Sequence, residues 1–430
     1  MISRTVIKNA GRVPAPTAMT RPLAWLFAVA VGIIVLPLFA SQPLVELIGA
    51  SFGTSEASAS SIPTTTMAGY AAGLILVVPL VDLLENRRVI AATLAAGIVA
   101  LVSAAFAPSP ALLMVSCFLS GVATSAIQML VPFAASITPV SSRGAVIGNI
   151  MSGLMIGVLL SRPIASLTAA AFGWRFVYVI DALLIIPAAA VLWRVLPTRK
   201  PIEPSCYGTL ISSLAALLKT ERSLRRRATY QALCMAAFGA FWTTIALRLS
   251  QPPFFLGQTG IAAFALVGVG GMIVAPIAGR LGDLGWSGPA TLAAHLAAIA
   301  ALALAGVSGA GWLGFDLAAQ PNLALGLLAT AAVLLDVGVI ADQTIGRRTV
   351  NLLRVEARGR MNGLYTGLFF IGSAVGAASA GAAWSNGGWS LTCGLGIAFV
   401  LAAFILALVT ESKVVSYQGR LILPREASDR

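Results

Sequence analysis

The stretch RGAVIGNIMSGLMIG at residues 143–157 recurs later in the chain as RGRMNGLYTGLFFIG at residues 358–372. The two copies are 215 residues apart, and the same shift pairs Gln128 with Gln343. Two further pairs of segments follow in the same order, residues 41–43 with 250–252 and residues 78–82 with 279–283. Similarity at several ordered positions indicates a duplicated structural unit. The sequence therefore predicts two related halves.

The composition excludes a soluble domain. Of the 430 residues, 58% are hydrophobic and only 10% are charged, and the mean hydropathy is +0.92. A helix that crosses the hydrocarbon core of a bilayer needs about 20 mostly apolar residues. Twelve windows of this kind lie at residues 23–48, 62–84, 89–107, 111–137, 145–170, 174–196, 229–251, 261–281, 287–307, 322–345, 361–384 and 389–410. We therefore expect an all-α polytopic membrane protein with twelve transmembrane helices in two pseudo-symmetric six-helix bundles.

Charge and polarity divide the chain further. The expected parts are an N-terminal tail at 1–21, a six-helix bundle at 22–196, a linker at 197–228, a second bundle at 229–410 and a C-terminal tail at 411–430. The linker contains an amphipathic stretch at 207–219, which is typical of a helix lying at the membrane surface. The net charge of +13 comes from cations in the tails, the linker and alternate loops. Because cytoplasmic loops carry the excess of Lys and Arg, we expect both termini to be cytoplasmic in a bacterial-type inner or plasma membrane, and the charge implies no nucleic-acid partner.

Several motifs resemble those of the major facilitator superfamily. In VPLVDLLENRR, at residues 78–88, Asp82, Arg87 and Arg88 match the signature of the family's loop between its second and third spans. Gly148 and Gly157 have the spacing of a glycine-rich signature in its proton-coupled antiporters, although Ser161-Arg162-Pro163 stands where those proteins have Gly-Pro. The segments FWTTIAL at 241–247 and LLDVGV at 334–339 resemble sequences of the family's drug and metabolite efflux branch. The resemblance implies two bundles that rock around a central solute site by alternating access.

The resemblance also implies roles for particular residues. A conformational latch at the cytoplasmic end is expected from Asp82, Arg87, Arg88, Arg143 and Asp283. A carboxylate at a helix end can accept charge-assisted hydrogen bonds from neighbouring helix ends, although the arginines also serve as plain topology signals. Close helix packing is expected at Gly148, Gly157, Gly363 and Gly372.

Three ionisable residues fall inside apolar windows: Arg162, Arg248 and Asp336. Such residues cost a few kcal/mol at membrane depth, so each suggests a functional site. The alternative for each is a buried ion pair or a bond to backbone carbonyls between helices. Two arginines facing a cavity favour an anionic substrate, whereas a carboxylate beside an arginine suits a proton switch.

Uncharged polar and aromatic residues give weaker candidates for substrate contact. Gln42 and Gln251 precede prolines that can break a helix and free backbone carbonyls. Gln128 and Gln343 are paired by the repeat. The aromatic candidates Trp242 and Tyr365 line a pocket only if they are not ordinary packing residues.

The chain has no G-x-x-x-x-G-K-[ST] loop for ATP, and none of its four lysines follows a glycine. The expected function is therefore secondary transport, most simply proton-coupled efflux of a small organic solute by a monomer in the bilayer. The alternative is a carrier of organic anions that uses Arg162 and Arg248. An enzyme or receptor is a remote alternative, because the acids are isolated and His295 is the single histidine. The spacing of the four cysteines predicts no metal site, and no cofactor is expected.

Overall fold

The computed structural model describes residues 20–139, 142–198, 206–315, 317–354 and 357–422, and these residues form helices and no strand. Residues 1–19 and 423–430 of the two expected tails and residues 199–205 of the expected linker lie outside the described residues. Within the described ranges, eleven helical stretches are long and apolar enough to cross a membrane. The last of them, Arg358–Thr410, contains the non-helical residues Gly387 and Gly388 and so comprises two spans. The prediction of twelve spans is confirmed.

The first half of the chain contains six spans, several of them built from consecutive helical segments. In order they are α1 (Arg21–Ile34), α2 (Leu36–Ala40), η1 (Gln42–Leu44) and α3 (Val45–Phe52); α4 (Glu56–Ala59), α5 (Ser61–Ala72), η2 (Gly73–Val77) and η3 (Val78–Asp82); α6 (Asn86–Ala105); α7 (Pro110–Thr124) and α8 (Ala126–Ser136); α9 (Arg143–Phe172); and α10 (Trp174–Val195). The helical form follows from the bilayer, which offers no partner for a free backbone N–H or C=O group.

The second half begins after the linker helix α11 (Tyr207–Thr220). Its spans are α12 (Arg222–Ser250); α13 (Gln258–Ala265), η4 (Leu266–Gly268) and α14 (Val269–Asp283); α15 (Ser287–Ala310); α16 (Pro321–Leu353); and α17 (Arg358–Ile422). The short helix η5 (Trp312–Gly314) lies between α15 and α16. Helix α17 continues past residue 410, where the last window of the sequence ends.

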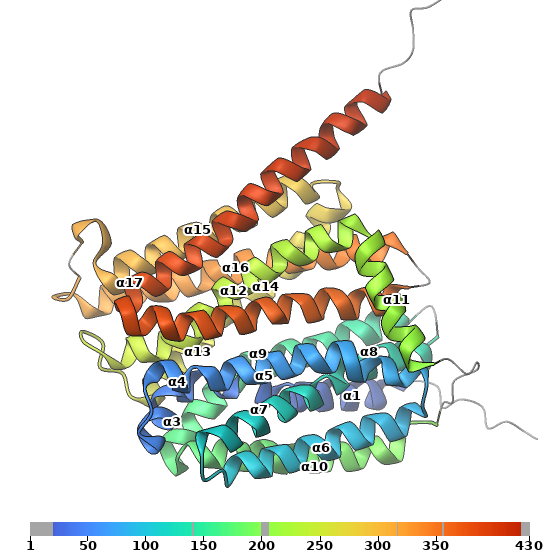
Figure 1. Cartoon of the computed structure of the whole chain (residues 1–430), viewed down its shortest axis with the longest axis horizontal. Coiled ribbons are helices and arrows are strands. Elements are labelled where there is room, and N and C mark those ends of the chain that lie inside the picture. The colour runs from blue at the N-terminus through green and yellow to red at the C-terminus, as the bar shows by residue number, and fades with distance from the viewer. Residues whose placement is uncertain (1–19, 140–141, 199–205, 316, 355–356, 423–430) are drawn as a thin grey trace, which may run out of the picture.

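The two halves form two helical layers that lie side by side (Figure 1). They meet along α5 with α17 and along α9 with α13, which pairs the second span with the eleventh and the fifth with the eighth. The same correspondence holds inside each half, because α1 packs on α9 as α12 packs on α17. These paired contacts agree with the duplication that the sequence indicates.

Close helix packing occurs at only one of the two predicted glycines in each half. At Gly157 an added Cβ would lie 2.8 Å from the carbonyl carbon of Gly32, and at Gly372 it would lie 2.6 Å from that of Ala232. At Gly148, by contrast, a Cβ would meet nothing within 4 Å, and at Gly363 the nearest atom would be 3.8 Å away. The expectation for these two glycines is corrected, because each lies on a part of its helix that no neighbouring backbone approaches closely.

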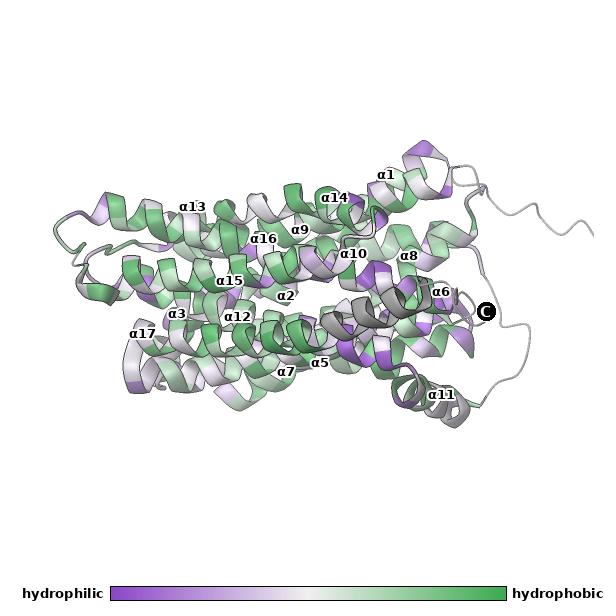
Figure 2. Cartoon of the chain, turned by 90° about the horizontal axis from the view of Figure 1, so that it is seen from above, coloured by the Kyte–Doolittle hydropathy of each residue, from purple (hydrophilic) through white to green (hydrophobic). Residues whose placement is uncertain are grey.

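The linker helix α11 contacts both halves. The hydroxyl of Tyr207 donates to the carbonyl of Leu76 at 2.8 Å, and Arg360 Nη1 donates to Ser213 Oγ at 2.9 Å. Figure 2 shows hydrophobic residues along the middle of the helices and many of the hydrophilic ones near the end that carries α11. We call this end, which also carries Asp283 and Arg358, the basic end.

Candidate functional site

A cavity of about 730 Å³ lies between the two halves. Its walls are mainly apolar and come from α2, α5, α8 and α9 on one side and from α12, α14, α16 and α17 on the other. The apolar lining includes Met151, Met155, Phe238, Phe369 and Phe370. Toward the basic end the lining becomes polar, with Asp283, Arg347, Arg348, Asn351 and Arg358. The cavity is therefore an apolar chamber whose charged part lies toward the basic end.

Four of the predicted site residues gather at the inner part of this cavity. Arg162 on α9 donates from Nε to Gln42 Oε1 at 2.7 Å, and its guanidinium lies 4.3 Å from the centre of the Trp242 ring. Trp242 on α12 donates from Nε1 to Asp336 Oδ1 on α16 at 3.0 Å. All four side chains are buried, Arg162 at 5% exposure and Asp336 at 4%. A cation from one half and a carboxylate from the other are thus joined through one tryptophan.

Local sequence features position Gln42 and Arg162. Pro43 follows Gln42, and the first span changes there from α-helix to the 3-10 turn η1. Such irregular backbone at membrane depth is tolerated where it lines a cavity or is buried in protein. Arg162 is further enclosed by Phe39 and Phe238, whose ring centres lie 4.9 and 5.5 Å from its guanidinium. The aromatic rings replace part of the solvation that the cation loses on burial.

Two donors at this site lack a hydrogen-bond partner among the described residues. They are Arg162 Nη2 and Gln42 Nε2, both fully buried. A buried donor without an acceptor costs about 1–3 kcal/mol. Arg162 lines the cavity, so an acceptor atom of a bound molecule would satisfy its free donor.

Three other predicted residues lie around the same cavity. Gln128 and Gln343 both line it, and Gln128 Nε2 lies 3.5 Å from the Tyr70 hydroxyl. Tyr365 is fully buried and donates to the backbone carbonyl of Gln343 at 3.2 Å. Tyr365 therefore fixes α17 against α16 behind the cavity wall and does not line the cavity.

Arg248 and Gln251 do not belong to this site. Arg248 donates from Nε to the Gly309 carbonyl at 2.6 Å and from Nη1 to the Pro252 carbonyl at 2.5 Å. Gln251 is exposed and caps the C-terminal end of α12. The expectation that these two residues contact the substrate is corrected, because Arg248 is held by two backbone carbonyls, Gln251 is exposed at the end of α12, and neither lines the cavity. Arg248 is the backbone-carbonyl lock that the sequence left as its alternative.

Three residues of the expected latch, Asp283, Arg87 and Arg88, have contacts of their own at the basic end. Asp283 pairs with Arg348 Nε at 2.8 Å, and both residues line the cavity. Asp82 ends η3 and is exposed. Arg87 lies 4.3 Å from the centre of the Trp193 ring, and Arg88 pairs with Glu85 at 3.1 Å.

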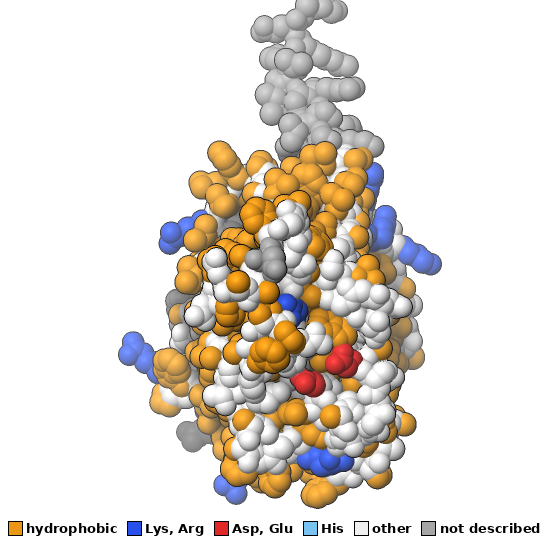
Figure 3. All heavy atoms as spheres, turned by 90° about the vertical axis from the view of Figure 1, so that its left-hand side faces the viewer, with side chains coloured by type: hydrophobic (Ala, Val, Ile, Leu, Met, Phe, Trp, Pro, Cys, Tyr) orange, Lys and Arg blue, Asp and Glu red, His pale blue; other side chains and the backbone are white. Residues whose placement is uncertain are grey.

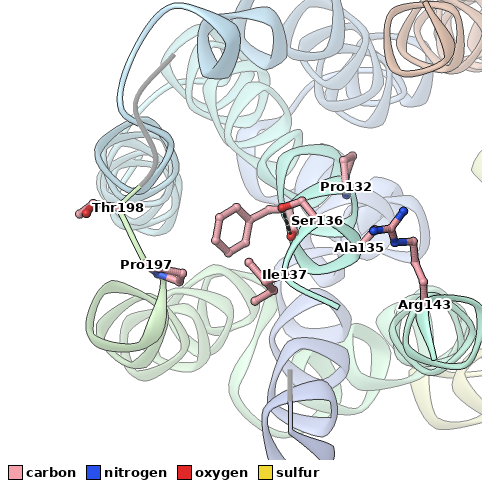
Figure 4. Close-up of a pocket in the computed structure, with 8 residues that line it drawn as sticks. Pro132, Ala135, Ser136, Ile137, Arg143, Pro197 and Thr198 are labelled. Carbon is pink, nitrogen blue, oxygen red and sulfur yellow. Dashed lines mark hydrogen bonds between the residues drawn. The ribbon is translucent and has the colours of Figure 1, made fainter. Parts of the chain in front are cut away.

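Arg143, the remaining latch candidate, borders a second pocket. This pocket of about 620 Å³ lies between α8, the start of α9 and the chain after α10 (Figure 4). Among the described residues of its lining, Arg143 is the single ionisable one, and it donates to the Thr138 carbonyl at 3.4 Å. The pocket belongs to the first half alone, so Arg143 does not join the two halves here.

At the end opposite α11 the two halves are in contact. Trp384 on α17 donates from its indole nitrogen to Glu56 on α4, and a Cβ at Gly381 would touch Ser60 Cβ at 2.9 Å. Figure 3 views the molecule from this end, where charged side chains are scattered among apolar ones. The boundary between the two halves, which we call the seam, is therefore packed at this end, while the cavity extends toward the basic end.

Sequence reasoning missed two groups of residues. Phe39, Tyr70 and Phe370 form an aromatic contact across the two halves, with Tyr70 and Phe370 ring centres 4.6 Å apart. A second group, Cys234, His295 and Asp342, lies inside the second half with ligand atoms within 4.8 Å of one another. The only available signal was the presence of each polar side chain in an apolar window, because the three residues come from three different helices.

Twelve membrane-spanning helices in two related halves around a central cavity define a membrane transporter. Comparison with known families agrees: residues 27–343 match the Major Facilitator Superfamily, and the chain belongs to this family. Its relatives include a putative transporter, YgaY, of Escherichia coli K12, which is 32% identical over 90% of this chain and 97% of the relative. A chloramphenicol resistance protein of Streptomyces lividans is 28% identical over 53% of this chain and 64% of the relative.

A solved structure shares the fold. The nucleoside transporter NupG superposes with a TM-score of 0.68 at 14% sequence identity, over 90% of this chain and 99% of NupG. At this identity the likeness concerns the fold alone. The family and the fold identify the chain as an integral membrane transporter.

Proposed function

We propose that this transporter is a proton-coupled exporter of small, largely apolar organic molecules. Asp336 is the proton-accepting group and Arg162 is the group that contacts the substrate. The observation that carries the proposal is the shared tryptophan: Trp242 holds Asp336 by a 3.0 Å hydrogen bond and stacks on Arg162 at 4.3 Å. Asp336, which takes up the proton, and Arg162, which contacts the substrate, are thus connected through Trp242.

The coupling follows from charge. While Asp336 is ionised, it attracts Arg162 across the seam and accepts a charge-assisted hydrogen bond from Trp242, a bond worth about 1.5–3 kcal/mol. Protonation removes the negative charge and weakens both interactions, which frees the side of the seam formed by α9 and α12. Because binding linkage is reciprocal, a substrate that takes over Arg162 also changes the affinity of Asp336 for its proton.

The substrate class is inferred from the lining. Met151 and Met155, which are flexible and polarisable, and the phenylalanines of the chamber favour apolar molecules of varied shape. The unpaired donor of Arg162 favours an acceptor atom on that molecule. The partial similarity to a chloramphenicol resistance protein is consistent with efflux.

The orientation is part of the proposal. Arg347, Arg348 and Arg358 line the part of the cavity nearest the basic end. By the excess of positive residues on cytoplasmic loops, this end faces the cytoplasm and both termini lie inside. The cavity then faces the compartment from which an exporter takes up its substrate.

A second candidate function is transport of organic anions. It is supported by the charges of the cavity: the described residues of its lining include four arginines, Arg162 among them, and two carboxylates, Asp283 and Asp336. A cationic excess attracts carboxylate or phosphate groups. In this alternative Asp336 is a structural partner of Arg162 and not a proton carrier.

The test is transport by purified protein in proteoliposomes with an imposed pH gradient, using chloramphenicol, an aromatic cation and an aromatic carboxylate as probes. We expect the gradient to drive accumulation of at least one probe, and Asp336→Asn to abolish gradient-driven accumulation while retaining exchange of labelled for unlabelled probe. Glu46→Gln, at the far end in α3, is the matched control and should behave as the parent does. Accumulation that is unchanged in Asp336→Asn contradicts the proposal. Gradient-independent transport of the carboxylate alone, lost in Arg162→Gln, favours the second candidate.

A further inference from the structure

Three helices of the second half bring three metal-binding residue types together, apart from the cavity. Cys234 on α12, His295 on α15 and Asp342 on α16 each place one ligand atom within 4.8 Å of the other two. Cys234 and Asp342 are each 1% exposed, and His295 is fully buried. None of the three lines the central cavity. The proposed transport step uses none of them.

The separation of His295 from Asp342 fits metal coordination better than hydrogen bonding. His295 Nε2 lies 3.6 Å from Asp342 Oδ1, which is too long for a hydrogen bond. Accordingly, Nδ1 and Nε2 of His295 and Oδ1 of Asp342 have no hydrogen-bond partner among the described residues. Tetrahedral zinc holds its ligands at about 2.0–2.3 Å, so two of its ligand atoms are about 3.3–3.8 Å apart. The separation of His295 Nε2 from Asp342 Oδ1 falls inside that range, and the ligand atom of Cys234 lies within 4.8 Å of both residues.

The charges also balance. A thiolate from Cys234 and a carboxylate from Asp342 carry two negative charges, which a divalent cation neutralises, and the imidazole of His295 binds as a neutral ligand. Buried charges in proteins are paired or coordinate metals. Gln231, one helical turn before Cys234, adds a buried side-chain oxygen without a hydrogen-bond partner in the part of the chain that the structure describes.

Polar and aromatic contacts join α12 to α15 beside the cluster. Arg227, two turns before Cys234 on α12, donates to Thr291 Oγ1 at 2.7 Å. Thr291 lies one turn before His295 on α15, and Tyr230 packs edge-on against the His295 ring with centres 5.9 Å apart. Arg227 therefore donates to a hydroxyl on α15 that lies one turn before His295. The thiol of Cys234 and the imidazole of His295 lie further along the same two helices, and the carboxylate of Asp342 comes from α16.

From this geometry we propose that Cys234, His295 and Asp342 form a structural site for a divalent transition metal, with zinc as the best match to a sulfur, nitrogen and oxygen ligand set. The metal ties α12, α15 and α16 together. Because α12 also carries Trp242 and α16 carries Asp336, the site fixes the relative position of the two helices that hold the tryptophan and the carboxylate of the cavity.

The experiment measures metal content and spectroscopy on the full-length chain, purified in detergent with a tag that lacks histidine. The protein is stripped with a chelator, incubated with Zn²⁺ and freed of excess metal by gel filtration. We expect about one zinc per chain and a higher thermal midpoint than that of the stripped protein. Incubation with Co²⁺ should give a thiolate-to-cobalt charge-transfer band, which appears only if a cysteine is a ligand.

Isosteric variants assign the ligands. Cys234→Ser, Asp342→Asn and His295→Gln should each lose most of the retained zinc, and Cys234→Ser should lose the charge-transfer band. Cys393→Ser is the matched control, a buried cysteine of the same half outside the cluster, and should keep both. If a variant is not monodisperse, the cobalt spectrum of the parent chain still decides. Retention of no zinc by the parent, or equal retention by the parent and Cys234→Ser, overturns the proposal.

Discussion

Replacing Gly157 by alanine tests whether the close contact between α1 and α9 is real. An added Cβ would lie 2.6 Å from Val35 Cγ1 and 2.8 Å from the carbonyl carbon of Gly32. The atom nearest to it would be the carbonyl oxygen of Gly32, and ordinary contacts of a Cβ begin at 3.4 Å, so the two helices must part by more than 0.8 Å. A gap of this size forfeits about a quarter to a half of the dispersion energy of the facing atoms. Overpacking of this kind costs about 1–3 kcal/mol.

The assay is thermal unfolding of purified Gly157→Ala in detergent, followed by tryptophan fluorescence. For a unit the size of one bundle, 1 kcal/mol corresponds to about 2–4 °C, so the expected fall in the midpoint is about 2–12 °C. Gly148→Ala is the matched control on the same helix, because a Cβ there meets nothing within 4 Å. Alanine favours helix over glycine by about 0.5–1 kcal/mol, so the control should be unchanged or slightly more stable. If Gly157→Ala matches or exceeds the parent and the control, the contact does not exist as described.

Three further predictions concern single side chains. Trp242→Phe keeps an aromatic ring but removes the donor to Asp336; losing a bond worth about 1.5–3 kcal/mol reduces gradient-driven transport by about 10- to 150-fold, and parental transport rates would contradict the assigned bond. Arg248→Gln removes two bonds to backbone carbonyls and should lower the thermal midpoint by several degrees without changing the apparent KM, so a raised KM would return Arg248 to the substrate site. Asp283→Asn breaks an exposed ion pair with Arg348, which is worth at most about 1 kcal/mol; the thermal midpoint should hardly move, and a large fall would show that the pair carries more.

The fold could be predicted almost entirely from the sequence. The membrane imposes a window of apolar residues on every span, and duplication leaves matching residues such as Gly157 and Gly372 at a constant shift. Gly157 and Gly372 both pack closely, whereas the other matching pair, Gly148 and Gly363, does not. The position of a glycine on its helix gives the face that it occupies, but the neighbour on that face depends on tertiary packing.

The candidate site was predictable in part. Arg162 and Asp336 stand out because charge is expensive in an apolar span. Gln42 and Gln251 look equivalent in the repeat, yet Gln42 lies at a mid-span turn and Gln251 at a helix end. The difference is one of depth, which depends on where each helix begins. The cluster around His295 could not be predicted, since contacts between three helices leave no spacing along one segment.

The linker helix α11 has a kinetic consequence. It is hydrogen-bonded to Leu76 in the first half through Tyr207 and to Arg360 in the second half through Ser213. If the halves rotate against each other, the helix cannot follow both, so one bond must be exchanged for water in every cycle. The activation barrier for turnover then includes the breaking of a contact made by residues that do not line the cavity. Substitutions in this surface helix can set the speed of the carrier while leaving its selectivity untouched.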